Sequence, residues 1–240
     1  MEPKKSLKFP GITPPATSWV HKPKFTGNPG VELSEPYKRI LQPHFVWYVV
    51  GKPGSGKSFM VEELLLNKEL YCGRFNDVFI FSPNKMPSLP CDEGKNWFME
   101  LNTATLMATI DWVVENKPTS NVLIIIDDCI STLKSLEKDT EVMNLFYNRR
   151  HVIPKGTVSF MITGQKYITF PPKIRSVLTG LLVFRVQGND WRTIAKENSF
   201  NDNDKLVSLM VDEHWKKDSH NFAYFKLDTG DIYLNFSKKI

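Results

Sequence analysis

The segment from Gly51 to Ser58, Gly-Lys-Pro-Gly-Ser-Gly-Lys-Ser, constrains the fold of this 240-residue chain more than any other part of its sequence. An apolar run over 45–50 precedes the segment and a helical pattern over 57–70 follows it, so it should turn a strand into a helix. Glycines let backbone N–H groups turn inward around an anion, and the amino end of a helix adds a positive pole. We therefore predict a loop that binds the phosphates of a nucleotide such as ATP, formed by Gly51, Lys52, Pro53, Gly54, Ser55, Gly56, Lys57 and Ser58.

Two side chains of this loop have specific chemistry. Lys57 can reach the β- and γ-phosphates, which makes it a candidate catalytic residue, and the Ser58 hydroxyl can coordinate Mg²⁺. The alternative is a glycine-rich turn that binds no ligand. The flanking strand and helix favour the nucleotide site.

Composition sets wider bounds on partners and on cellular compartment. A net charge of +5 and a pI near 9.0 permit an anionic partner without requiring one. No apolar run approaches the roughly 18 residues of a membrane helix, and no apolar stretch follows the first lysines as a secretory signal would require. The three cysteines have no metal-ligand spacing, and their odd number argues against a disulfide framework. We expect an intracellular protein without a membrane partner.

Residues 1–43 differ in composition from the remainder of the chain. Eight of the 16 prolines lie there, together with seven basic and three acidic residues. Proline blocks helices and removes backbone donors, so we predict an extended, basic arm. Such an arm could contact a neighbouring subunit or DNA phosphates, or wrap irregularly over the domain surface.

The remainder, 44–240, is predicted to form one α/β domain with a mostly parallel central sheet flanked by helices, because apolar runs alternate with helical patterns. We expect strands at 45–50, 77–82, 121–127, 157–163 and 180–186, and helices at 57–70, 103–116, 139–150 and near 203–217. Near the end, the apolar runs 222–227 and 232–236 flank the turn sequence Asp-Thr-Gly-Asp, which predicts a C-terminal β-hairpin.

Two consecutive carboxylates, Asp127 and Asp128, follow the run Val-Leu-Ile-Ile-Ile, which has the composition of a buried parallel strand. Acidic residues at such a strand end are typical of nucleotide hydrolases. Asp127 would hold Mg²⁺ through a water, and Asp128 would orient or deprotonate the attacking water. Two carboxylates that only cap a strand end are the alternative.

The strand expected at 157–163 ends in Thr163 and is followed by Gln165. If this strand lies between that of the phosphate loop and that of Asp127, its end faces the γ-phosphate. Gln165 could then sense the phosphate or position the water. A polar strand end without a function is the alternative.

Basic residues flank the Gln165 segment on both sides. Arg150 precedes it and Arg175 follows it, and a guanidinium that reaches a neighbour's γ-phosphate would stabilise transition-state charge. Arg150 is the first candidate for this role and Arg175 the second. Solvated basic helix ends are the alternative.

Together these residues resemble the genome-packaging ATPases of nucleocytoplasmic large DNA viruses and virophages, in the FtsK/HerA branch of P-loop ATPases. The resemblance spans roughly 45–186. It rests on the phosphate loop, Asp-Val-Phe-Ile-Phe-Ser-Pro at 77–83, Ile124 to Asp128, Arg150-His151, Thr163-Gly-Gln165 and Pro-Pro-Lys-Ile-Arg at 171–175. Many relatives in the wider superfamily have Glu at the position of Asp128.

This resemblance implies a RecA/FtsK-like sheet with an extra strand between the two nucleotide-binding strands. It also implies an ATPase that drives double-stranded DNA into a preformed capsid, acting as a homo-oligomeric ring (hexamer or pentamer) beside capsid vertex proteins. The expected location is the host cytoplasm or viral factory, or the virion itself. Two other functions use the same loop: a small-molecule phosphotransferase such as a nucleoside kinase, and an ATP-gated assembly or scaffold protein with negligible turnover.

Overall fold

The computed structural model describes residues 44–67, 70–198, 206, 208–236 and 238–239, so the predicted arm 1–43 lies outside the described residues. A single sheet of nine strands, in the order β3-β2-β4-β5-β1-β6-β7-β8-β9, runs through the described part. The strands are β1 (Val46–Val50), β2 (Asp77–Phe81), β3 (Trp97–Phe98), β4 (Asn121–Ile126), β5 (Thr157–Gly164), β6 (Gly180–Val183), β7 (Ala223–Lys226), β8 (Asp231–Leu234) and β9 (Lys238–Lys239).

Strands β1 to β6 are parallel, and β7, β8 and β9 extend the sheet in antiparallel fashion. The order confirms that β5 lies between β4 and β1, as expected for a RecA-like sheet. The predicted C-terminal hairpin is confirmed as β7 and β8. Because parallel strands all end at one edge, the residues that follow β1, β2, β4, β5 and β6 are brought to the same side of the molecule.

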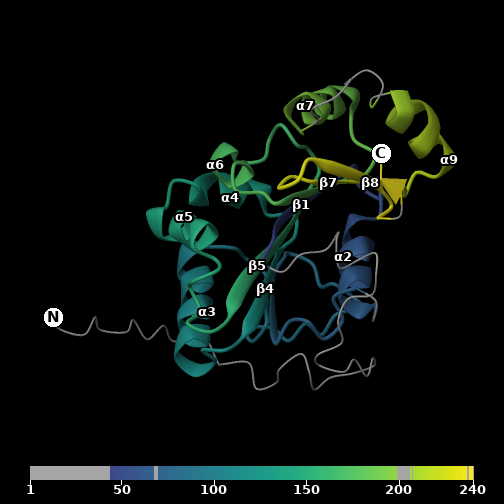
Figure 1. The fold of residues 1–240 in the computed structure, drawn as a ribbon. Helices are drawn as coiled ribbons and strands as arrows, with labels where there is room; N and C mark the ends of the chain where they lie inside the picture. Colours follow the sequence, from purple (N-terminus) through teal and green to yellow (C-terminus); the bar gives the residue numbers. More distant parts are fainter. Residues whose placement is uncertain (1–43, 68–69, 199–205, 207, 237, 240) are drawn as a thin grey trace.

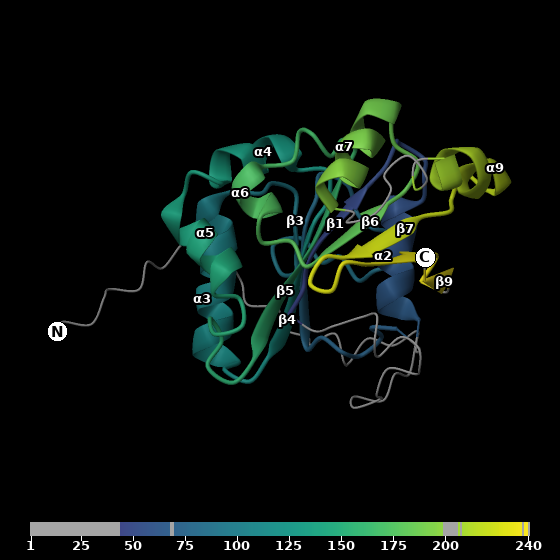
Figure 2. The ribbon, with the colours of Figure 1, turned by 45° about the horizontal axis from the view of Figure 1, so that its top comes forward.

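Helices cover both faces of the sheet (Figure 1). In Figure 2, α2 lies on one face, and α3 and α5 lie on the other. The helical elements are α2 (Lys57–Leu66), α3 (Thr103–Asn116), α4 (Ile130–Leu136), α5 (Thr140–Tyr147), α6 (Pro172–Arg175), α7 (Gly188–Asn198), the π-helical segment Leu209–His214 and α9 (Trp215–Lys217). None of the helices among the described residues is both long and apolar enough to cross a membrane.

Side chains of β1 alternate between the two faces and so join both cores. Tyr48 packs into the core beneath α3 and stacks on Phe170, with ring centroids 4.0 Å apart. Trp47 points to the opposite face, where it packs against Phe45 and Tyr71 in the core beneath α2. Every residue of β1 is buried, so the strand is fixed on both sides and holds the loop that follows it.

The expected strands and the helix 103–116 are confirmed to within a few residues. The helix expected at 57–70 ends at Leu66 because Asn67 turns to an extended conformation. The helix expected at 139–150 stops at Tyr147. Part of the helix expected near 203–217 lies outside the described residues, and Leu209–His214 within it is π-helical. The short elements β3, α4, α6 and the 11-residue α7 were not predicted.

Candidate nucleotide-binding site

The phosphate loop and the acidic pair lie at the carboxyl edge of the sheet, separated by one strand. Val50, the last residue of β1, is paired with Gly164 of β5. On the other side of β5, Ile126 at the end of β4 is paired with Ile162. The helices that follow β4 and β5, α4 and α6, lie beside each other in Figures 1 and 2. The structure therefore brings Gly51, Asp127 and Gln165 to adjacent strand ends.

Glycines are required in the loop for two different reasons. Gly54 and Gly56 have φ values of 73° and 97°, a region that residues with a Cβ rarely adopt. Gly51 has no room for a side chain, because a Cβ there would lie 2.6 Å from both the Phe184 Cβ and the Ser55 Oγ. The loop is thus a tight backbone turn, as the sequence predicted.

Lys57 is the first residue of α2 and is held inside the loop. Its Nζ donates to the carbonyl oxygens of Gly51 at 2.9 Å and Lys52 at 3.1 Å. Burial lowers the pKa of Lys57, while the nearby carboxylates of Asp128 and Asp127 oppose that shift. The ammonium therefore lies between the loop and the acidic pair, the region in which a γ-phosphate would be bound.

The amino end of α2 has the features of an anion site. Its N-cap residue is Gly56, and no side chain caps the first turn. The uncapped N–H groups of a first turn, with the positive end of the helix, attract phosphate. Ser58 in this turn is exposed, whereas Ser55 is buried, and its Oγ has no hydrogen-bond partner in the described part of the chain. Lys52, Pro53 and Gly54 form the exposed tip of the loop.

Asp127 is buried and accepts hydrogen bonds through both carboxylate oxygens. Oδ1 accepts from Thr163 Oγ1 at 2.6 Å, and Oδ2 accepts from Ser82 Oγ at 3.1 Å. These hydroxyls come from the ends of the strands on either side, β5 and β2. The carboxylate is held in one orientation, and its remaining lone pairs are available to a further ligand.

Asp128 is exposed and has an unusual backbone conformation. Its φ is 53°, a left-handed value that aspartate tolerates better than most residues. Its backbone N–H donates to Thr163 Oγ1 at 3.2 Å. Gln165 follows β5 directly and is exposed at the same edge. Both side chains are therefore free to meet a ligand bound above β5.

Arg150 lies at the other edge of the sheet. The carbonyl of the preceding Arg149 accepts from Val158 N near the start of β5, and the Arg149 guanidinium binds the carbonyl of His44, just before β1. Arg150 is exposed beside His44, whose pKa is lowered by burial and then by Arg150 and Arg149. A five-residue strand, roughly 13 Å from end to end, separates this position from the loop.

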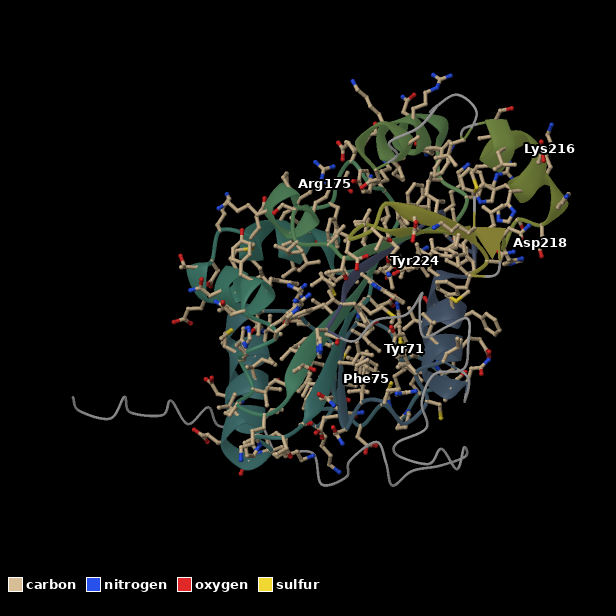
Figure 3. The ribbon with its side chains drawn as sticks, viewed as in Figure 1. Tyr71, Phe75, Arg175, Lys216, Asp218 and Tyr224 are labelled. Atoms are coloured by element: carbon tan, nitrogen blue, oxygen red, sulfur yellow. The ribbon has the colours of Figure 1, made fainter. Side chains whose placement is uncertain are left out.

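Arg175, at the end of α6, is held by its own chain (Figure 3). Its guanidinium lies 3.6 Å from a carboxylate oxygen of Glu197 and 5.1 Å from the ring centre of Tyr167. The structure thus places neither arginine among the residues around the phosphate loop. Any contact of Arg150 or Arg175 with a nucleotide on a neighbouring subunit stays a prediction.

The donor set fits a magnesium ion shared with a nucleotide. Within the described residues, no three His, Cys, Asp or Glu side chains converge to hold a metal by themselves. Magnesium commonly uses one or two protein oxygens together with substrate phosphates and water. The carboxylate of Asp127 and the exposed hydroxyl of Ser58 are such oxygens, so they are the residues that would hold it.

Three residues that contact the loop or the acidic pair were not predicted to have a role: Ser82, Arg185 and His220. Ser82 ends the apolar run 77–82, and the rule that parallel strands end at one edge could have drawn attention to it. The carbonyl of exposed Arg185 accepts from Lys52 N at 3.0 Å. The ring of His220 lies beside Gly56, because a Cβ added at Gly56 would lie 3.3 Å from its Cδ2. No sequence pattern indicated His220.

Comparison with known sequences gives one distant viral relative. No protein-family model matches the chain. Uncharacterized protein 015R of Frog virus 3 (isolate Goorha) is 29% identical over an alignment of 164 residues that covers 60% of this chain. The match takes in 45% of that protein, so this chain corresponds to less than half of its relative.

Solved structures give a closer match in architecture. The genome packaging NTPase B204 of Sulfolobus turreted icosahedral virus 2, in complex with AMP, has a TM-score of 0.62 at 12% identity, covering 81% of this chain and 98% of B204. B204 of Sulfolobus turreted icosahedral virus, described as a DNA-packaging ATPase, has a TM-score of 0.59 at 13% identity over the same shares. The likeness to packaging ATPases inferred from the sequence is thereby confirmed at the level of the fold: this chain has the fold of B204, with a mostly parallel sheet flanked by helices.

Proposed function

We propose that this protein is an ATP-hydrolysing motor that moves double-stranded viral DNA into a preformed capsid. The observation that carries the proposal is the convergence of the phosphate loop and Asp127 at one sheet edge, with only β5 between them. The fold supports it, because B204 is described as a genome packaging NTPase and has been solved with AMP, ATPγS and AMPPCP.

Nucleotide binding would use the backbone of the loop and one side-chain movement. The N–H groups around Gly54 and Gly56 and the first turn of α2 would hold the phosphates. Lys57 would exchange the carbonyl oxygens that it now contacts for phosphate oxygens. This exchange gives the buried ammonium a negative partner, which offsets the cost of its burial.

Hydrolysis would use the residues at the ends of β4 and β5. Asp127 and Ser58 would hold Mg²⁺, which neutralises charge on the phosphates when bound. Asp128 would orient the attacking water or take its proton, and Gln165 would position that water beside the γ-phosphate. The exposure of Asp128 and Gln165 at adjacent strand ends supports these roles.

The action of Arg150 on a nucleotide would require a second copy of the chain. Arg150 is at the opposite edge from its own loop, so it could reach only a neighbour's nucleotide. We therefore propose a homo-oligomeric ring, a hexamer or pentamer, in which Arg150 is the first candidate for the trans-acting arginine and Arg175 the second. Duplex DNA and capsid vertex proteins would be its partners, in the host cytoplasm or viral factory.

The deciding experiment measures ATP turnover of the full chain with and without long linear duplex DNA. We expect DNA to raise turnover, and the effect to weaken steeply with salt, since contacts to DNA phosphates release counterions. Lys57→Ala should abolish turnover and leave thermal unfolding nearly unchanged. Lys138→Ala, which removes an exposed lysine between α4 and α5, is the matched control and should retain turnover.

Two other outcomes would point to other functions. Phosphorylation of added nucleosides without any response to DNA would identify a phosphotransferase. ATP-dependent oligomerisation, with turnover no faster than that of Asp128→Ala, would identify an assembly protein that binds ATP without using its hydrolysis. Full ATPase activity of Lys57→Ala would show that the phosphate loop takes no part in hydrolysis.

A further inference from the structure

The carboxylate of Asp127 is fixed by two hydroxyls that come from different strands. Thr163 precedes the last residue of β5, and Ser82 follows β2. These two strands flank β4, so the Thr163 hydroxyl reaches Oδ1 from one side and the Ser82 hydroxyl reaches Oδ2 from the other. Thr163 and Ser82 are fully buried, and Asp127 is 7% exposed. The two contacts join residues 36 and 45 positions apart, so they depend on the assembled sheet.

Neutral hydrogen-bond donors are unusual as the partners of a buried carboxylate. A buried charge is commonly paired with an opposite charge, because desolvation is otherwise costly. Within the described residues, Asp127 has no salt-bridge partner, and the nearby Lys57 ammonium donates to loop carbonyls instead. Two hydroxyls fix the direction of the carboxylate without cancelling its charge. An arrangement of this kind suits a carboxylate that must attract a cation.

Thr163 makes a second contact that extends the arrangement to Asp128. Its Oγ1 donates to Asp127 and accepts the backbone N–H of Asp128. Asp128 has a positive φ, a conformation that a non-glycine residue keeps only when neighbours hold it. One hydroxyl therefore ties both acidic residues to β5, two positions before Gln165.

We propose that Ser82 and Thr163 are positioning residues for the nucleotide site. They would hold the Asp127 carboxylate directed toward the metal-bound triphosphate, and Thr163 would also fix the backbone that presents Asp128. The inference rests on the proposed nucleotide function and assigns that function two residues outside the phosphate loop and the acidic pair. A purely structural role for the two hydroxyls, as satisfied polar groups in the core, is the competing explanation.

The test combines three variants with one matched control. Thr163→Val removes the hydroxyl and nearly keeps the shape, Thr163→Ser retains the hydroxyl, and Ser82→Ala removes the second donor. Ser159→Ala is the control. Ser159 lies on the same strand and is 1% exposed, but its buried Oγ has no hydrogen-bond partner among the residues that the structure describes. Any general effect of deleting a buried hydroxyl from β5 should appear in the control too.

The readout separates metal-dependent binding from binding of the nucleotide itself. Calorimetry would measure the affinity for ATPγS with Mg²⁺ and with a chelator, and turnover would be measured in parallel. Groups that orient a metal ligand typically contribute 10- to 100-fold, so we expect about that loss of Mg²⁺-dependent affinity in Thr163→Val and Ser82→Ala. In these two variants the affinity for ATPγS in chelator should stay within about twofold of wild type, and kcat should fall. Thr163→Ser retains the hydroxyl, so it should recover most of the Mg²⁺-dependent affinity and most of kcat.

Two results would overturn the inference. In the first, Thr163→Val and Ser82→Ala match Ser159→Ala in Mg²⁺-dependent affinity while only their melting temperatures fall, so the hydroxyls act on stability alone. In the second, Thr163→Ser loses as much Mg²⁺-dependent affinity as Thr163→Val. If Thr163→Val does not fold, Ser82→Ala decides by the same criterion. A wild-type chain that binds no ATPγS would instead refute the proposed function.

Discussion

Two neighbouring strands carry buried aspartates at opposite ends, and the two carboxylates have different hydrogen-bond and ion-pair partners. Asp77 begins β2 at the amino edge of the sheet and accepts from the Ser120 hydroxyl at 2.6 Å and from the Lys117 ammonium. Asp127 follows β4 at the carboxyl edge, with two hydroxyls and no ion pair among the described residues. Both are nearly inaccessible, at 2% and 7% exposed.

The difference separates a carboxylate that stabilises the fold from one that is available to a ligand. At the amino edge a lysine neutralises the charge of Asp77, so the group is satisfied within the protein. At the carboxyl edge the nearby cation, Lys57, donates to loop carbonyls, and Asp127 has no ion-pair partner among the described residues. Substitutions at the two edges should therefore change different properties of the protein.

The largest effect is expected for Asp127→Asn. The variant keeps the shape but removes the charge, and a metal ion supplies several kcal/mol of transition-state stabilisation, so turnover should fall on the order of 1,000-fold. Steady-state ATPase assays check the rate, and urea unfolding should show a stability close to wild type. If Asp77→Asn slows turnover as much as Asp127→Asn does, the proposed difference in role between the two aspartates is wrong.

A smaller loss of turnover, about 100-fold, is expected for Asp128→Asn. Asparagine tolerates the positive φ at this position, so the backbone should be kept while the group that orients or deprotonates water is lost. Rates measured under saturating ATP, where kcat falls and KM changes little, would support a role in the chemical step. Unchanged kcat would assign the base to another residue.

At the amino edge, Lys117→Met should destabilise the fold without affecting chemistry. The substitution leaves the buried Asp77 carboxylate without its cation, and an unsatisfied buried group costs about 1–3 kcal/mol. Urea denaturation would measure the loss, and turnover per folded molecule should equal that of wild type. A loss of activity with unchanged stability would contradict the division between the two edges.

The smallest effect on stability is expected for substitution of a third aspartate, Asp139. Asp139 caps α5 and accepts from the Thr103 hydroxyl, and that hydrogen bond is the main reason its pKa lies below the ordinary value. Because the folded-state pKa is lowered, the stabilisation is present at neutral pH and is lost as pH falls through that pKa. Asp139→Ala should cost no more than about 1 kcal/mol at pH 7.

Denaturation at neutral and acidic pH tests the Asp139 prediction. The difference between wild type and variant should shrink below about pH 4, the range in which an ordinary aspartate begins to take up its proton. A stability difference that grows as the pH falls would contradict the lowered pKa of Asp139 in the folded state. Turnover should be unaffected, since Asp139 lies at the start of α5 and outside the candidate site.

Most of the long, regular elements were predicted, with the 11-residue α7 as the exception, and several short elements were not. Strands β1 and β4 contain continuous apolar runs, β5 is apolar over Phe160–Ile162, and α3 has enough turns to display its periodicity. In contrast, β3 has two residues and α6 has four, too few for any period to appear. Such elements form because the packed sheet offers them a partner.

Of the site, the sequence by itself determined the phosphate loop and the acidic pair. Glycine conformation and the change from strand to helix are encoded by adjacent residues, so they can be recognised along the chain. The tertiary structure alone decided that Ser82 and Thr163 enclose Asp127, that His220 lies beside Gly56 and that Arg150 lies at the far edge. These contacts join residues far apart in the chain, and strand order and register, which are set by packing of the whole sheet, determine which of them meet.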